Sequence, residues 1–184
     1  MKTLETKRLI LRPWSMNDVD DMYEYAQNSK IGPRAGWPPH KTKEDSLKII
    51  QMFMKSETEW AIEERATGKV IGSIGCRQDS MRMKNGLKAK NIGYVLSECY
   101  WGRGIMPEAV ERILHECFEE ECVNVVSISH SILNLNSKRV IEKCGFVYEG
   151  TLRQALVFEG VISDAMVYSI VKTDWEMLKK QTGC

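Results

Sequence analysis

Residues 100–109 read YWGRGIMPEA and hold the arrangement with the clearest chemical potential in the chain. Gly102 and Gly104 stand directly before a stretch with apolar residues at helical spacing. Glycine adopts backbone conformations that point successive N–H groups at one spot, and a helix N-terminus adds the positive end of its dipole. Pro107 suits a first helical turn, where its missing N–H costs nothing. The loop therefore predicts a cradle for a phosphate or pyrophosphate, although a plain tight turn would also explain Gly-x-Gly.

Two common nucleotide-binding patterns do not fit this loop. A dinucleotide fingerprint needs a third glycine where this chain has Pro107, and an acid closing the next strand, where it has Ser129 and His130. A phosphate loop of the ATPase type needs Gly-Lys-Ser/Thr after four spacer residues, which is absent from the sequence. Hydride transfer and nucleotide hydrolysis are thus excluded.

Composition limits the partners of the protein. Its 184 residues carry 26 Lys and Arg against 25 Asp and Glu, so no overall field attracts nucleic acid or an anionic membrane. No apolar run of about 18 residues exists, and the N-terminal MKTLETKRLIL lacks the apolar core of a signal peptide. We expect one cytoplasmic domain, residues 1–184, that contacts neither nucleic acid nor membrane directly. Homo-oligomerisation stays open.

The cysteines and histidines do not form a metal-binding pattern. No Cys-x-x-Cys pair is present, and the histidines do not lie at ligand spacing to the thiols. We expect free thiols, most of them packed as small hydrophobic side chains, and no metal. The residues concerned are Cys76, Cys99, Cys117, Cys122, Cys144 and Cys184, with His40, His115 and His130.

The elements that would position the glycine loop read as a mixed sheet with helices. Helix starts are expected at Ser15 and Thr42, and Asn134 is expected to cap a further helix that Gly145 stops. A helix separates the strands on either side of the loop, which implies parallel pairing there, whereas the flanking hairpins imply antiparallel pairing. Strands are expected over 4–12, 60–64, 70–76, 91–97, 122–130, 146–158 and 162–171, and helices over 15–28, 42–56, 106–120, 134–144 and 173–180.

The stretch 77–90 is rich in Lys and Arg around a single acid, Asp79. A solvated loop explains this composition, and so does a segment that lines the entrance used by a charged substrate. The cations are Arg77, Arg82, Lys84, Lys88 and Lys90.

Two longer motifs resemble a known family. NIGYVLSECYWGRGIMPEA followed by NLNSKRVIEKCGFVYEGTLR is similar to the GNAT superfamily of N-acetyltransferases, in its ribosomal-protein N-terminal acetyltransferase (RimJ/RimL-like) branch. The segment 8–12, Trp60 and a closing DAMVYS strand also match the branch, so the resemblance covers nearly the whole chain. It implies an α/β fold with a splayed central sheet of six to seven strands and about four helices, and acetyl-CoA in the gap, without a metal.

The resemblance also implies which residues bind the co-substrate. The amides of Arg103, Gly104 and Ile105 would hold the pyrophosphate, and the backbone from Val95 to Ser97 would pair with the pantetheine arm. Asn134 would bond the pantetheine or phosphate side, or simply cap its helix. The full set is Val95, Leu96, Ser97, Gly102, Arg103, Gly104, Ile105, Met106 and Asn134.

Acyl transfer then needs an oxyanion donor, help for the leaving thiolate and a proton acceptor. A backbone N–H near Leu96 could serve the oxyanion. Relatives outside the branch have a tyrosine in the slot of Ile141, and Ser137, one helical turn earlier, can present a hydroxyl instead. A helix serine that bonds its own backbone is the alternative. Cys99 and Cys144 have no evident partner base for covalent catalysis, so direct transfer is expected.

The general base is not identified by the sequence. Asp164, Glu98, Glu159 and Tyr94 are candidates, each also explicable as a surface or structural group. A protein α-amine has a pKa of about 7.7–8.0 against about 10.4 for lysine, so it needs less help at neutral pH. Asn91 stands where an acid often precedes the strand, which weakens an acidic role there.

The predicted function is acetyl-CoA-dependent transfer to a primary amine, favouring a protein N-terminal α-amine. A small-molecule amine, such as a polyamine or an aminoglycoside, is one alternative acceptor. A non-catalytic acyl-CoA-binding module is the alternative from another class.

Overall fold

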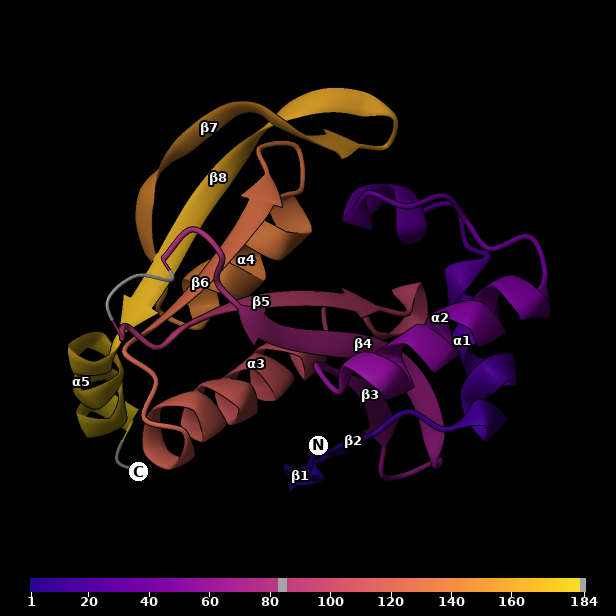
Figure 1. Ribbon diagram of the computed structural model, residues 1–184, viewed down its shortest axis with the longest axis horizontal. Coiled ribbons are helices and arrows are strands. Elements are labelled where there is room, and N and C mark those ends of the chain that lie inside the picture. The colour runs from indigo at the N-terminus through magenta and orange to yellow at the C-terminus, as the bar shows by residue number, and fades with distance from the viewer. Residues whose placement is uncertain (83–85, 183–184) are drawn as a thin grey trace.

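The computed structural model describes residues 1–82 and 86–182, and within them the chain is built on one mixed sheet (Figure 1). Eight strands among these residues lie in the order β1-β2-β3-β4-β5-β6-β8-β7. Strands β5 and β6 pair parallel and the other neighbours antiparallel, as predicted from the helix between them. The strands are β1 Leu4–Glu5, β2 Leu9–Arg12, β3 Glu59–Glu64, β4 Lys69–Gln78, β5 Ala89–Leu96, β6 Val125–Ser131, β7 Val147–Phe158 and β8 Val161–Val171.

The expected single strand over 4–12 is wrong, and the strand count of six to seven is too low. The chain turns between β1 and β2, which pair with each other. Thr6 closes the turn, because its hydroxyl accepts the Leu9 N–H at 2.9 Å and donates to Glu108 at 2.6 Å. Hydrogen bonds between Thr6 and Leu9 thus hold a turn inside a segment whose residues alternate like one strand, and Glu108 fixes the Thr6 hydroxyl from a distant part of the chain.

The predicted capping residues lie at helix starts, although Ser15 caps a short 3₁₀ turn, Met16–Asp18, that precedes the first α-helix. Ser15 and Thr42 both form capping boxes, and the Asn134 side chain accepts the Ser137 N–H at 3.2 Å. Gly145, with φ +78°, follows the helix that it was expected to stop. The described part of the chain has five α-helices where about four were expected: α1 Val19–Ala26, α2 Lys43–Ser56, α3 Ile105–His115, α4 Leu135–Lys143 and α5 Lys172–Thr182.

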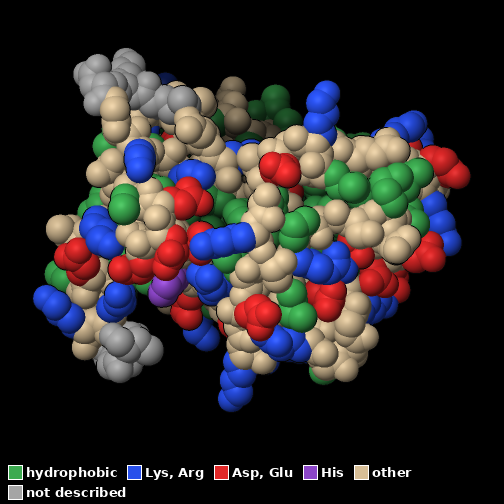
Figure 2. Space-filling view, turned by 60° about the horizontal axis from the view of Figure 1, so that its bottom comes forward, with side chains coloured by type: hydrophobic (Ala, Val, Ile, Leu, Met, Phe, Trp, Pro, Cys, Tyr) green, Lys and Arg blue, Asp and Glu red, His purple; other side chains and the backbone are tan. Residues whose placement is uncertain are grey.

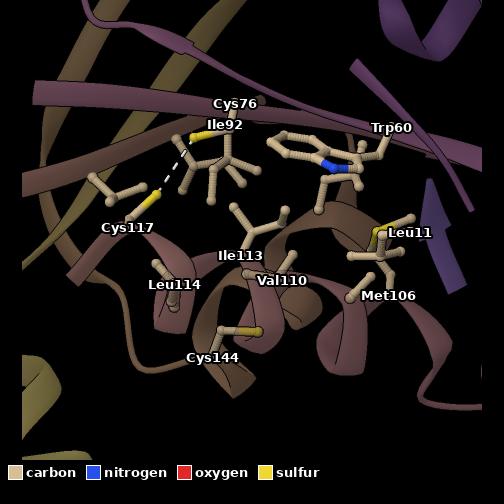
Figure 3. Packing of buried hydrophobic residues seen from close by; sticks show 14 of the residues in the cluster. Leu11, Trp60, Cys76, Ile92, Met106, Val110, Ile113, Leu114, Cys117 and Cys144 are labelled. Carbon is tan, nitrogen blue, oxygen red and sulfur yellow. Dashed lines mark hydrogen bonds between the residues drawn. The ribbon is translucent and has the colours of Figure 1, made fainter. Parts of the chain in front are cut away.

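Helices cover the two faces of the sheet and bury two separate cores. Trp60 and Ile62 of β3 pack on the same side as α3, whereas Ala61 between them packs with α1 and α2, as strand alternation requires. Figure 3 shows the larger core, in which Val110 and Ile113 of α3 point at the sheet. The α3 helix is therefore fixed against the sheet along its length, and its N-terminus is held at the end of β5.

The thiols pack largely as expected. Cys76, Cys117 and Cys144 are buried, with 3.5 Å between the sulfurs of the first two (Figure 3), whereas Cys99 and Cys122 are exposed. All five are free. Cys184 lies outside the described residues.

The feature that positions the site is the separation of β5 from β6. Their pairing is confined to Ala89–Asn91 against Val125–Ser127. Beyond these residues, and within the described part of the chain, β5 continues to Leu96 paired only with β4, and β6 continues to Ser131 paired only with β8. The splayed sheet that the family resemblance implies is confirmed.

Charges of both signs are interspersed on the surface, as Figure 2 shows for one face. The basic stretch 77–90 is not a free cationic loop where it is described, because Arg82 pairs with Asp79 and Glu149, and Arg77 with Glu59. None of its described residues lines the cleft treated below; Lys84 lies outside the described part. No helix in residues 1–82 and 86–182 is long and apolar enough to cross a bilayer.

Candidate active site

A cleft of about 730 Å³ opens where β5 and β6 separate. The free edge of β5, the loop before α3 and the first turns of α4 form one part of its wall. The segment 30–36 and Leu156 and Val157 of β7 form another. In Figure 1 the β7–β8 hairpin projects past the sheet and curves back toward the segment that precedes α2. The cleft therefore runs from the glycine loop at one end to the β7–β8 hairpin at the other.

The glycine loop has the conformation that its sequence predicts. Gly102 and Gly104 have φ +74° and +72°, a region that side chains with a Cβ disfavour. Gly104 is the N-cap of α3, so the N–H groups of Ile105 and Met106 lie in its first turn, where no intrahelical acceptor exists. Among the described residues, the N–H groups of Arg103 and Gly104 have no hydrogen-bond acceptor either. The loop thus offers consecutive unpaired donors at the positive end of a helix dipole.

Arg8 holds the other side of this loop. Its guanidinium donates to the Arg103 carbonyl at 2.9 Å and to the Gly104 carbonyl at 3.0 Å. The C=O and N–H of a trans peptide point in opposite directions, so this clamp turns the N–H groups of Gly104 and Ile105 away from Arg8. Glu108 fixes Arg8 in turn, accepting its Nε–H at 2.6 Å and its backbone N–H at 2.9 Å.

The ionised form of Glu108 is favoured by these contacts. Burial on its own would raise the pKa of Glu108, but hydrogen bonds from Thr6 and Arg8 and the charge of Arg8 lower it below its usual value. A carboxylate therefore locks the arginine that orients the loop.

The free edge of β5 presents the backbone of Leu96. The Ser97 N–H donates to the Ile71 carbonyl of β4 at 2.8 Å, and alternation along a strand turns the Leu96 backbone to the opposite edge. The Leu96 carbonyl accepts the Trp101 indole N–H at 2.8 Å. The Leu96 N–H is left facing the gap between the strands.

Ser137 on α4 meets a phenol from β5. The Tyr94 hydroxyl lies 3.0 Å from the Ser137 hydroxyl oxygen. Burial raises the pKa of Tyr94, against a smaller lowering by the Ser137 hydrogen bond, so the phenol stays protonated at neutral pH. Ile141, in the slot where other relatives have tyrosine, is fully buried in the core. A tyrosine from a different element therefore stands beside the serine.

His130, on β6, lines the same cleft. The Ser131 carbonyl lies 2.6 Å from His130 Nδ1 and also accepts the Asn134 N–H at 2.8 Å. Nδ1 must be the donor in this pair, which leaves Nε2 as the acceptor, and Nε2 is buried with no partner among the described residues. Burial lowers the pKa of His130, so its ring is neutral at neutral pH.

Of the four candidate bases, only Tyr94 lines the cleft. Glu98 pairs with Lys30 at 2.6 Å, and hydrogen bonds from Lys30 and Asn28 lower the pKa of Glu98. Glu159 pairs with Arg34 at 2.8 Å, and Asp164 accepts the Gln154 N–H at 2.8 Å. No carboxylate lines the cleft in the described part of the chain, whereas four cations do: Lys30, Arg34, Arg139 and Lys143.

Comparison with known proteins identifies the fold and its chemistry. The sequence profile of the family described as "Acetyltransferase (GNAT) domain" matches residues 8–147. The chain belongs to this family. It is accordingly an acetyl-CoA-dependent N-acetyltransferase, and the family expected from its motifs is confirmed.

Individual relatives match the acetyltransferase over most of its length. The uncharacterized N-acetyltransferase YoaA of Bacillus subtilis is 29% identical, over 92% of this chain and 96% of its own. The ribosomal-protein-serine acetyltransferase of Escherichia coli is 29% identical, over 89% and 93%, which supports the resemblance to the RimJ/RimL-like branch. The crystal structure of a GNAT-family acetyltransferase from Bacillus anthracis superposes with a TM-score of 0.81 at 21% identity, covering 94% of this chain and 99% of that one.

The residues present suit acetyl-CoA as the co-substrate. Consecutive N–H donors without acceptors are what a pyrophosphate requires, and Arg139 and Lys143 add two cations nearby on one face of α4. The thioester of acetyl-CoA supplies the acyl group.

The acetyltransferase brings most of the predicted site residues together. Those that line the cleft are Val95, Leu96, Gly102, Gly104, Ile105, Met106, Asn134 and Ser137. Ser97 and Arg103 do not line it: Ser97 faces a smaller pocket beside Cys99, and the Arg103 guanidinium lies 5.2 Å from the Tyr100 ring centroid.

Several residues of the site were not assigned a role from the sequence. Arg8 was noted only as part of a motif, and its contact with the loop spans 95 positions along the chain. Arg139 and Lys143 are four residues apart on the helix that Asn134 caps. This spacing places both cations on one helix face and could have been recognised in the sequence. The Tyr94 contact with Ser137 depends on how β5 and α4 pack, and no local pattern encodes it.

Proposed function

We propose that this acetyltransferase transfers the acetyl group of acetyl-CoA to a protein N-terminal α-amine by direct attack of the amine on the thioester. The observation that carries this proposal is that one cleft holds the unpaired donors of the glycine loop, the free Leu96 N–H and the paired hydroxyls of Ser137 and Tyr94. The protein acceptor is supported by the name of the Escherichia coli relative, which acts on a ribosomal protein.

The glycine loop and the β5 edge bind the co-substrate in this proposal. The amides of Arg103, Gly104 and Ile105 hold the pyrophosphate, and Asn134 contributes from the first turn of α4. The Ser97 N–H already donates to the Ile71 carbonyl, so on the open edge of β5 the pantetheine arm pairs with the Leu96 carbonyl, whose second lone pair is left after it accepts the Trp101 indole N–H.

The Leu96 N–H also serves the reaction itself. It donates to the carbonyl oxygen that gains negative charge as the amine adds. A fixed donor of this kind stabilises the transition state more than the ground state.

Ser137 assists the departure of the sulfur. Its hydroxyl donates to the developing thiolate while the protonated Tyr94 hydroxyl donates to the serine oxygen. This chain of hydrogen bonds strengthens the serine as a donor. The C–N bond forms, the C–S bond breaks, and the amine proton passes to water.

The charges of the cleft favour an α-amine over a polycation. A lysine amine or a polyamine is almost fully protonated at neutral pH, and no carboxylate among the described lining residues helps to remove its proton. An α-amine, with a pKa of about 7.7–8.0, is partly neutral already. The four cations of the cleft also disfavour polyamines and aminoglycosides.

An acceptor panel tests the proposal. Release of CoA from acetyl-CoA is measured with N-terminal peptides, the same peptides with a blocked N-terminus, spermidine and an aminoglycoside. Release that requires a free peptide N-terminus is expected. Acetyl-CoA binding with no acceptor-dependent release, or release only with the polycations, contradicts it.

A further inference from the structure

Arg34 lies at the hairpin end of the cleft. Its guanidinium carbon is 5.4 Å from the Trp101 ring centroid and 5.8 Å from that of Phe158. Its Nε donates to Glu159 at 2.8 Å, and the Glu159 N–H donates to the Pro33 carbonyl at 2.8 Å. The guanidinium is therefore held by two aromatic rings and one carboxylate.

The terminal nitrogens of Arg34 remain available. Neither Nη atom has a hydrogen-bond partner within residues 1–82 and 86–182, and Arg34 lines the cleft with 31% of its side chain exposed. A planar guanidinium presents these two nitrogens as a fork that matches a carboxylate or phosphate. Since its position is fixed before binding, little conformational entropy is lost when an anion binds.

The distance from Arg34 to the reacting groups is set by one indole ring. The Trp101 ring that lies against Arg34 donates its N–H to the Leu96 carbonyl, and Leu96 carries the proposed oxyanion donor. Successive Cα atoms are about 3.8 Å apart. An acceptor with its amine at Leu96 can therefore place an anionic group at Arg34, across the Trp101 ring, when that group is one or two residues from the amine.

We infer that Arg34 binds an anionic group that the acceptor carries close to its amine. The enzyme therefore prefers peptides with an acidic side chain directly after the N-terminal residue. This inference rests on the proposed function and specifies its acceptor. Lys30 adds a second cation at the same end of the cleft, although it pairs with Glu98. Glu159 pairs with Arg34 through Nε alone, so a substrate carboxylate would bind the two Nη atoms, and none of the described residues that line the cleft is an acid that competes for them.

Paired acceptors test this without any mutation. Initial rates are measured for two peptides that differ only in Asp or Asn after an N-terminal serine. A second pair, a free amino acid and its amide, distinguishes a side-chain carboxylate from an α-carboxylate. We expect a preference of roughly ten- to a hundred-fold in kcat/KM for the Asp peptide, as for a charge-assisted hydrogen bond. Equal rates overturn the inference and leave the proposed function standing, whereas no turnover of any peptide contradicts the function itself.

Three variants separate recognition from structure. Arg34→Gln should abolish the Asp preference mainly through KM, with the Asn peptide and CoA affinity unchanged, because the lost interaction is made equally in the ground state. Glu159→Gln removes the charge that pairs with Arg34 and keeps the guanidinium, so the preference should persist. Arg153→Gln, an exposed charge on β7, is the matched control. If Arg34→Gln slows both peptides equally, or if Glu159→Gln loses the preference as well, Arg34 only anchors the hairpin and the inference is wrong.

Discussion

The Tyr94 hydroxyl lies 3.0 Å from Ser137 Oγ and so joins the open edge of β5 to the first turn of α4. The two residues are 43 positions apart. The contact forms where the two strands have separated, at the place where the proposed thioester would lie. The contact places two protonated hydroxyls side by side, although Ile141 stands where the family resemblance implies a tyrosine in other branches.

Ser137→Ala should lower kcat and kcat/KM alike. The serine hydroxyl interacts more strongly as negative charge builds on sulfur, so its loss acts on the transition state. Loss of one such donor costs about 2–4 kcal/mol, and the low end, roughly 30-fold, is expected because thiolate is a good leaving group. Steady-state kinetics and CoA titration calorimetry check this. Full kcat, or a joint loss of CoA binding and melting temperature, would show that Ser137 is a structural residue.

Tyr94→Phe is the companion variant to Ser137→Ala. It should slow the reaction less than Ser137→Ala, and the double variant should be no slower than Ser137→Ala alone, because Tyr94 acts through the serine. If the rate losses of the two single variants add in the double variant, Tyr94 does not act through Ser137.

Local patterns predicted the parts of the fold that local chemistry decides. Thr42 starts α2 by its own side chain, and Gly104 adopts a conformation that few other residues reach. The turn at Thr6 was missed because the alternation of residues 4–12 continues through it, and because part of what holds Thr6 is Glu108 on a distant helix.

The candidate site divides in the same way. The glycine loop could be predicted from its residues, since backbone donors at a helix start are encoded locally. The partners of Ser137 and of the loop could not, because Tyr94 and Arg8 reach them through the packing of separate elements. Glu98 and Glu159, which the sequence left open as bases or as surface groups, are each paired with a cation in the structure.

Gly104→Val should weaken CoA binding at least about tenfold. A β-branched residue at φ +72° is strained, and its Cβ would lie 3.7 Å from the Arg8 guanidinium that clamps the loop, so the substitution disturbs the loop conformation that presents the amides. Gly68→Val is the matched control, since Gly68 has φ +69° in the β3–β4 turn, away from the cleft. Calorimetry should show weakened CoA binding for the first variant only. Unchanged CoA affinity in folded Gly104→Val would argue against the cradle.

The stability of the enzyme should fall in acid partly through Glu108. The pKa of this carboxyl is lower in the folded than in the unfolded chain, so its stabilisation is complete above the unfolded value of about 4.3 and is lost as pH falls through the folded value. Glu108→Gln should therefore show a smaller drop in melting temperature between pH 6 and 3, and weaker CoA binding at pH 7. Glu111→Gln, an exposed charge on α3, controls for net charge. A wild-type acid slope in Glu108→Gln would refute the clamp.

Alkylation of the thiols should leave turnover largely intact. Cys99 and Cys122 are exposed and should react with iodoacetamide, whereas burial raises the pKa of Cys144 to about 12 and keeps it unreactive. Peptide mapping identifies the modified residues and the rate is measured on the same sample. Complete loss of transfer with CoA binding retained would instead indicate a cysteine nucleophile.

The most direct test of the account uses one peptide that offers both kinds of amine. A peptide beginning Ser-Asp and carrying an internal lysine is incubated with the enzyme and acetyl-CoA, and fragment-ion mass spectrometry locates the acetyl group while released CoA is quantified. The account predicts one acetyl on the α-amine for each CoA released, with the lysine unmodified. Acetyl on the lysine alone, or no acetylated peptide despite acetyl-CoA binding, would contradict it.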